Sequence, residues 1–183
     1  MIKRLLQILL LILIFYSISS AQIEYVSFGG KIGIGDIQGN STPVTSAAAG
    51  FFVDAIPWFS DGSFSLRAGF LYAQKLEKLI PENRMGRYYP FIKSFSLNGN
   101  LRQPWTSTIF IEEGAGLIFL NDRTFGDVNT WEAGANFNAL AGIDLRDMNS
   151  SGISLGLGME YGITFTGTTA SYYTIHAQIQ YYP

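Results

Sequence analysis

The stretch ISLGLGMEYGITF, residues Ile153–Phe165, decides the fold. Its odd-numbered positions are all apolar or aromatic, and its even-numbered positions are Ser, Gly, Glu or Thr. A repeat of two residues is that of a β-strand with one apolar and one polar face. A helix over the same residues would contain three interior glycines, each costing about 1 kcal/mol relative to alanine. The stretch therefore predicts a strand.

The same alternation recurs along the chain and predicts eight strands. The predicted strands are Val26–Ile34, Thr45–Ala55, Phe64–Tyr72, Tyr89–Leu97, Ile109–Phe119, Trp131–Leu145, Ile153–Phe165 and Tyr172–Tyr182. Turn formers between them predict turns at Pro57–Ser63, Asn98–Trp105 and Asp147–Gly152, and opposite loops at Asp36–Pro43, Lys75–Arg87, Asn121–Asn129 and Thr166–Ala170. Short connections favour antiparallel neighbours, so we expect an all-β, eight-stranded antiparallel up-and-down barrel.

The composition and the distribution of charge indicate which face of this barrel contacts lipid and which is enclosed. Only 14% of the residues are charged and 15% are aromatic, against roughly 25% charged in ordinary soluble domains. The apolar face carries no charge over the last three predicted strands, whereas the other face mixes Gly, Ser, Asn, Gln and isolated charges. A transmembrane barrel turns its apolar face outward, and a soluble lipocalin-like barrel turns it inward. The pattern favours a transmembrane barrel, with the lipocalin-like ligand-binding barrel as the alternative.

The N-terminus is typical of a signal peptide. Lys3 and Arg4 precede an apolar run, Leu5–Tyr16, and small residues follow at 19–21. The apolar run is shorter than the roughly 20 residues that a membrane-spanning helix needs. Residues 1–21 are therefore predicted to be a signal peptide, and residues 22–183 an exported barrel domain of the bacterial outer membrane. The mild net charge of -2 does not favour a nucleic-acid partner.

The segment FSLRAGFLYAQK, residues Phe64–Lys75, the Gly- and aromatic-rich strands and the aromatic last strand resemble the small outer-membrane β-barrel family, of the OmpX and OmpA-barrel type. The resemblance covers essentially the whole mature chain. It implies a structural, adhesive or binding role through surface loops, in contact with outer-membrane lipid and lipopolysaccharide, with no particular loop partner indicated. It also implies recognition by the barrel-assembly machinery through a C-terminal aromatic residue, although this chain ends Tyr181-Tyr182-Pro183.

Charged residues on the polar face predict a network inside the barrel. If the last two strands pair symmetrically across Thr166–Ala170, Phe165 faces Ser171 and Glu160 faces the single histidine, His176. The expectation is a structural Glu160–His176 ion pair that Lys31 joins from the first strand. The predicted lumen network consists of Lys31, Arg67, Glu112, Glu132, Asp144, Glu160 and His176.

A serine hydrolase is the sharpest enzymatic alternative. Gly152–Gly156 matches G-x-S-x-G, and Glu160 and His176 follow in the order found in hydrolases. Ser154 and Glu160, however, are six strand residues apart, or about 20 Å. The motif also requires a strand–turn–helix elbow. No catalytic residue is predicted from this pattern.

The segment EGAGLIF, Glu113–Phe119, is similar to a strand of the lipid A deacylase barrels, which use an adjacent His–Ser pair, whereas Ala177 follows His176 here. A lipid A-modifying enzyme or a degenerate relative remains the alternative function. The glycines of Gly33–Gly39 resemble a dinucleotide-binding loop, but no helix pattern follows them. With one His and no Cys, no metal site and no cofactor are predicted.

Two charges do not fit the pattern. In a regular strand Glu112 and Glu113 point to opposite faces, which sends Glu113 toward lipid, and Lys93 raises the same problem in its strand. We expect a β-bulge or a different register at Glu113. The long stem of Lys93 lets its ammonium reach the membrane surface.

Overall fold

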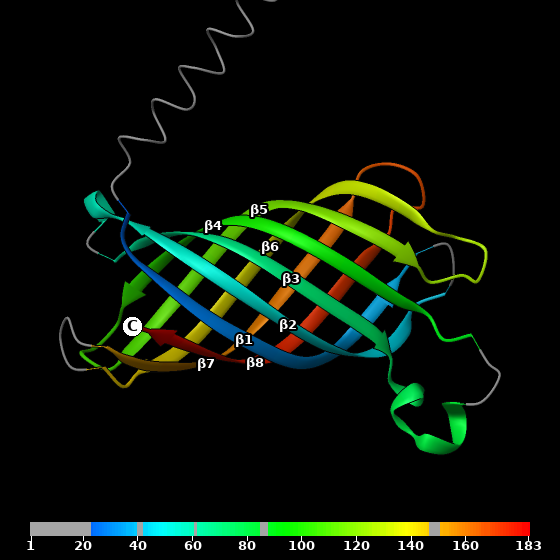
Figure 1. The fold of residues 1–183 in the computed structure, drawn as a ribbon, viewed down its shortest axis with the longest axis horizontal. Helices are drawn as coiled ribbons and strands as arrows, with labels where there is room; N and C mark the ends of the chain where they lie inside the picture. Colours follow the sequence, from blue (N-terminus) through cyan, green and yellow to red (C-terminus); the bar gives the residue numbers. More distant parts are fainter. Residues whose placement is uncertain (1–22, 40–41, 61, 85–87, 147–150) are drawn as a thin grey trace, which may run out of the picture.

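The computed structural model describes residues 23–39, 42–60, 62–84, 88–146 and 151–183. Its strands are β1 (Ile23–Gln38), β2 (Val44–Pro57), β3 (Phe64–Lys75), β4 (Phe91–Pro104), β5 (Ile109–Arg123), β6 (Thr130–Asp144), β7 (Gly152–Thr164) and β8 (Ser171–Tyr182), with 3-10 helices η1 (Trp58–Ser60), η2 (Leu76–Leu79) and η3 (Pro81–Arg84). Each strand pairs antiparallel with the next, and β8 pairs with β1 to close a barrel (Figure 1). The predicted fold is confirmed, while the predicted signal peptide lies outside the described residues.

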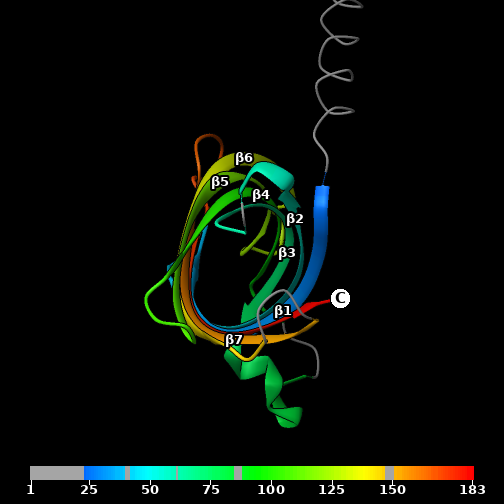
Figure 2. The ribbon, with the colours of Figure 1, turned by 90° about the vertical axis from the view of Figure 1, so that its left-hand side faces the viewer.

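The two ends of the barrel differ. The turn end holds Ile23, Tyr182 and the connections between β2 and β3, β4 and β5, and β6 and β7. The loop end holds the other four connections, of which the one between β3 and β4 is the longest and contains η2 and η3. Figure 2, seen along the barrel, shows these two helices outside the ring of strands. No helix among the described residues has the length and hydropathy needed to cross a membrane.

The alternation in the sequence becomes an inner and an outer face. On β7, Leu157 and Met159 are 70% and 51% exposed, while Ser154 and Glu160 are 2% and 3% exposed. Comparable outward apolar residues occur on all eight strands. This is the arrangement of a transmembrane barrel, opposite to that of a lipocalin-like barrel.

The strand boundaries correct several predictions. The predicted turn Asn98–Trp105 is wrong, because β4 continues to Pro104. Asn98 and Asn100 are buried, so the alternation simply continues with polar inward residues there. In the segment that resembles a dinucleotide-binding loop, Gly33 and Gly35 belong to β1 and Gly39 follows the strand's last residue. A Cβ on Gly35 would lie 1.8 Å from the carbonyl oxygen of Tyr173. Glycine at this position lets β1 approach β8 closely enough to close the barrel.

The register of β7 and β8 differs from the prediction by two residues. Ile163, not Phe165, faces Ser171, so Glu160 faces Thr174 and His176 faces Gly158. The loop between these strands contains two residues with positive φ, Gly167 and Thr169. A shift of two residues keeps every side chain on its own face. The alternation therefore predicted correctly which side chains face inward. The residue pairs across β7 and β8 depend on the conformation of the loop between them.

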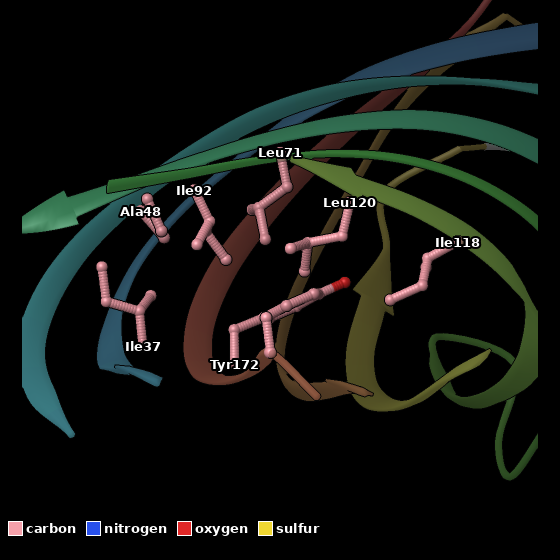
Figure 3. Packing of buried hydrophobic residues seen from close by; sticks show 9 residues of the cluster. Ile37, Ala48, Leu71, Ile92, Ile118, Leu120 and Tyr172 are labelled. Carbon is pink, nitrogen blue, oxygen red and sulfur yellow. The ribbon is translucent and has the colours of Figure 1, made fainter. Parts of the chain in front are cut away.

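An apolar cluster closes the lumen toward the loop end, which the expectation of a polar lumen did not foresee. Its side chains point inward from strands around the barrel and pack on Tyr172 (Figure 3). The members are Ile37, Ala48, Leu71, Ala73, Ile92, Ile118, Leu120, Ala170 and Tyr172. Barrels this narrow are filled by their own side chains, and here apolar packing replaces a water-filled passage.

This cluster predicts a difference between the two faces of β5. Leu120 is fully buried and Leu117 is 67% exposed on the outer wall. Leu120→Ala leaves a cavity and should lower the free energy of unfolding by about 2–4 kcal/mol. Leu117→Ala should cost much less, because surrounding detergent refills the space. Urea titration in detergent micelles measures both, and equal losses would contradict an apolar core inside the lumen.

Candidate functional site

The charged residues inside the barrel form separate clusters rather than one network. The first lies toward the turn end, where Arg67 donates from Nε to Asp54 Oδ1 at 2.7 Å and from Nη2 to Asp54 Oδ2 at 2.8 Å. Its Nη1 lies 2.9 Å from Glu112 Oε1. Gln180 Nε2 donates to Asp54 Oδ2 at 2.8 Å. One guanidinium thus links two carboxylates in a buried site.

Asp54 was missed by the sequence analysis. Its strand begins with small residues, TSAAAG, whose weak alternation hides the polar face. Counting forward from Ser46 in steps of two would have placed Asp54 on the inner face. The partner of Arg67 could therefore have been found from parity, although its bidentate geometry could not.

The second cluster centres on Glu160. Lys31 Nζ donates to Glu160 Oε2, and the Tyr172 hydroxyl donates to Oε1 at 2.6 Å. Asn136 Nδ2 adds a weaker contact to Oε1 at 3.4 Å. Lys31 and Glu160 are 10% and 3% exposed, so this is a buried ion pair that links β1 to β7 across the inner face of β8.

The predicted Glu160–His176 ion pair is wrong. The two-residue register shift places His176 opposite Gly158, and Lys31 and Tyr172 occupy the carboxylate of Glu160. His176 is 5% exposed, and its Nδ1 has no hydrogen-bond partner among the described residues. Lys31, expected as a third member, is instead the principal partner of Glu160.

The third cluster closes the turn end around Asp144. Arg102 Nη2 lies 2.9 Å from Asp144 Oδ2, and Arg146 binds the same carboxylate through Nε at 2.8 Å and Nη2 at 2.6 Å. The Arg146 guanidinium also stacks 3.5 Å from the ring centre of Tyr182. Partial burial acts to lower the pKa of Arg146, but the hydrogen bond to Asp144 raises that pKa above its usual value. Neither arginine was predicted to belong to the lumen network. Arg102 lies within the predicted turn Asn98–Trp105, and Arg146 follows the predicted strand Trp131–Leu145.

The fourth cluster lies at the loop end around Glu132. Thr164 Oγ1 donates to Glu132 Oε2 at 2.7 Å, and the Thr168 amide donates to Oε1 at 2.7 Å. Thr168 Oγ1 also donates to Asp122 Oδ2 at 2.6 Å. Glu132 is thus held by donors from the last residue of β7 and from the loop between β7 and β8, and it lies apart from the other predicted residues. Among the described residues no group of three or more His, Asp or Glu side chains could hold a metal ion.

The middle of the lumen is packed with amides. Asn100 and Asn138 flank Gly114 from the neighbouring strands, and their Oδ1 atoms lie 1.9 and 2.3 Å from the position that a Cβ on Gly114 would take. A cavity of about 20 Å³ lies nearer the turn end, beside Asp54, Arg102 and Tyr182. That volume holds about one water molecule. The described lumen is therefore a packed interior rather than a channel.

The geometry does not assemble the serine hydrolase triad. Ser154 faces Gln180, which lies four residues from His176 along β8, a separation of about 13 Å. Ser154, Glu160 and His176 are all buried inside the barrel. A lipid acyl chain outside the wall cannot reach them.

The outer wall carries both charges that the alternation could not explain. Neither predicted correction at Glu113 is needed, because β5 pairs with β4 and β6 in regular register there and Glu113 faces outward. Lys93 also faces outward and is exposed. It lies only two residues from the loop-end start of β4, where a flexible stem carries its ammonium toward the membrane surface.

The chain has the fold of the small eight-stranded outer-membrane β-barrels. It is similar to the neisserial surface protein A, with a TM-score of 0.63 and 7% identity over 85% of this chain and 96% of that one. It is also similar to Ail, the attachment invasion locus protein of Yersinia pestis. Ail alone gives a TM-score of 0.54 with 9% identity, over 87% of this chain and 99% of that one. Ail in complex with the heparin analogue sucrose octasulfate gives 0.55 with 6% identity, over 86% and 97%. No family model and no curated protein matches the sequence.

A mutation of Glu160 tests whether its buried partner is Lys31 rather than His176. Glu160→Gln leaves the buried ammonium of Lys31 without a counter-charge and should lower the free energy of unfolding by about 3–5 kcal/mol. Removing both charges, in Lys31→Met with Glu160→Gln, should recover most of the loss. Urea titration of the folded barrel in detergent provides the measurement.

Two controls accompany that experiment. Glu77→Gln removes the solvent-exposed partner of Lys75 and should change stability by less than about 1 kcal/mol. His176→Gln should also have little effect, because no ion pair depends on it. A loss with His176→Gln as large as that with Glu160→Gln would contradict the assigned pairing.

Proposed function

We propose that the protein is a non-enzymatic barrel of the bacterial outer membrane, exported through residues 1–21, with a structural or binding role at its loop-end surface. The observation that carries this proposal is the division of the strands into an exposed apolar face and a buried face that mixes polar, charged and apolar side chains. An outer wall of this kind is stable in contact with lipid acyl chains, because its apolar surface is then not exposed to water. The lumen holds buried ion pairs and packed amides, which supports a scaffold rather than a pore.

The unequal ends support an orientation. Outer-membrane barrels have short periplasmic turns and longer extracellular loops. The longest connection, between β3 and β4, lies at the loop end, and both ends of the barrel domain lie at the other. We therefore assign the loop end to the cell surface, where it meets lipopolysaccharide and external partners. Export and assembly would use the secretion and barrel-assembly machineries.

Exposed side chains at the loop end supply a surface for binding. Leu79 and Ile80 between β3 and β4, and Phe125 between β5 and β6, are 58%, 47% and 54% exposed. The structure of Ail with a heparin analogue is a case in which a barrel of this fold binds a ligand. That case supports a binding role here without indicating the ligand.

Membrane fractionation tests the location. The full chain expressed in a Gram-negative host should sediment with the outer membrane and require detergent for extraction. Without boiling, the folded barrel should resist SDS and migrate differently on a gel from the boiled protein. Protein that remains in the soluble periplasmic fraction without detergent would contradict the proposal.

A lipid profile tests the enzymatic alternative. His176 lies inside the barrel and is followed by Ala177 rather than Ser, which supports the non-enzymatic role. Mass spectrometry of lipid A from cells with and without the protein should give the same acylation pattern. Loss of an acyl chain that depends on expression would instead support a lipid A-modifying enzyme.

A further inference from the structure

The outer wall of the strands carries two cations at the loop end, on neighbouring strands. Lys93 lies near the start of β4, and Arg123 is the last residue of β5. The other strand cations, Lys31, Arg67 and Arg102, point into the lumen or form ion pairs there, and Lys75 at the end of β3 pairs with Glu77. Among the described residues, positive charge on the lipid-facing wall is therefore confined to one place at one end.

Lys93 and Arg123 lie close together. Lys93 pairs with Asn121, so Arg123 is its diagonal neighbour across β4 and β5, roughly 7–8 Å away. Both cations approach the ring of Phe91, with Lys93 Nζ 5.6 Å and Arg123 Cζ 5.5 Å from its centre. One aromatic ring thus holds two positive charges on the same patch of wall.

These two cations have no counter-charge within ion-pair distance among the described residues. Neither forms an ion pair with a described residue, and Arg123 Nε is buried without a hydrogen-bond partner there. Like charges on one face of a sheet destabilise it. An anion from outside the chain would relieve that repulsion.

Below the two cations, the outer wall carries first aromatic and then aliphatic side chains, in the same order as the headgroup and acyl-chain regions of a lipid leaflet. Beneath Lys93 and Arg123 come aromatic rings, with Trp131 stacked 4.9 Å from Phe119 and 5.9 Å from Phe95 between ring centres. Below these lie aliphatic side chains, Leu97 and Leu117, which are 58% and 67% exposed. Aromatic girdles mark the headgroup region of outer-membrane barrels. The cations therefore lie at the level of lipid phosphates.

Hydroxyl and apolar groups surround the same patch. Tyr72 pairs with Lys93 across β3 and β4, and its ring lies 5.7 Å from that of Phe91. The loop from β3 to β4, which leads into the strand of Lys93, exposes Leu76, Leu79 and Ile80, and its helices lie outside the ring of strands (Figure 2). The patch is thus polar at its centre and apolar on both sides, which suits the boundary between headgroups and acyl chains.

From this arrangement we propose that Lys93 and Arg123, with the Tyr72 hydroxyl, bind a phosphate of the phosphorylated glycolipid of the outer leaflet. A guanidinium and an ammonium together offer several donors to one phosphate group, and Arg recognises phosphate with its planar fork. Phe91 positions both cations, and the aromatic and aliphatic wall below receives the acyl chains. The inference rests on the proposed outer-membrane location and adds to it a defined lipid ligand.

The test uses the purified full-length mature barrel in detergent and bis-phosphorylated lipid A as the probe. Native mass spectrometry measures the bound fraction as lipid A is titrated. The double variant Lys93→Gln with Arg123→Gln should bind at least 10-fold more weakly than the unchanged protein. The unchanged protein should also bind dephosphorylated lipid A at least 10-fold more weakly, and its affinity for lipid A should fall with rising salt.

A matched control removes the same charge at the same end. Lys75→Gln with Lys78→Gln changes two cations at or next to the β3–β4 loop and should alter lipid A affinity less than 3-fold. An equal loss in both double variants, or equal binding of dephosphorylated lipid A, would overturn the site. Equally tight binding of phosphatidylglycerol would assign the patch to phospholipid headgroups and overturn the glycolipid ligand.

Failure of the lipid A site and failure of the proposed outer-membrane location give different experimental results. The gel mobility of the unboiled double variant verifies that it still folds, so a loss of binding is not a loss of structure. If the protein fractionates with the outer membrane but does not bind lipid A, the inference fails and the location stands. If it does not reach the outer membrane, the location fails whatever the binding measurement gives.

Discussion

The closed ring of strand pairs is the constraint on which the rest of this structure depends. Inside a bilayer no water is available to backbone N–H and C=O groups, so each must pair within the protein, and a sheet achieves this only when its edges meet. Here β1 and β8 meet over eleven residue pairs, from Phe28↔Tyr181 to Gln38↔Ser171. Glycines at Gly33 and Gly35 permit that approach, since a Cβ there would collide with the carbonyl groups of β8.

Closure with eight strands leaves a narrow interior, and the interior determines the chemistry that the protein can perform. The lumen is filled in layers, with arginines and carboxylates toward the turn end, amides and the Lys31–Glu160 pair in the middle, and apolar side chains toward the loop end. Buried ion pairs add little net stability over apolar packing, but losing one partner is costly. We infer that they specify which strands face one another more than they stabilise the barrel.

The outer wall and the loop end are consequently the surfaces that a ligand outside the barrel can reach. The lumen residues that attract attention in the sequence are enclosed: most bind other lumen residues, whereas the single histidine, His176, has no partner for its Nδ1 among the described residues. Lys93, which breaks the alternation, and Arg123, which the sequence placed in a loop, lie on the outer wall and can reach a ligand. Departures from a regular pattern are where function is expected, because the fold itself does not require them.

The sequence by itself determined that the chain forms strands, that there are eight, and which side chains face inward. These follow from a period of two, which Ile153–Phe165 displays without interruption. It did not determine the partners across strands, because a shift of two residues leaves every face unchanged. Only the tertiary structure determined these partners, through the conformation of the β7–β8 loop and the closure of β1 on β8. It pairs Glu160 with Lys31 instead of His176 and places Asp54 beside Arg67. It also brings apolar residues that are distant in the sequence together around Tyr172.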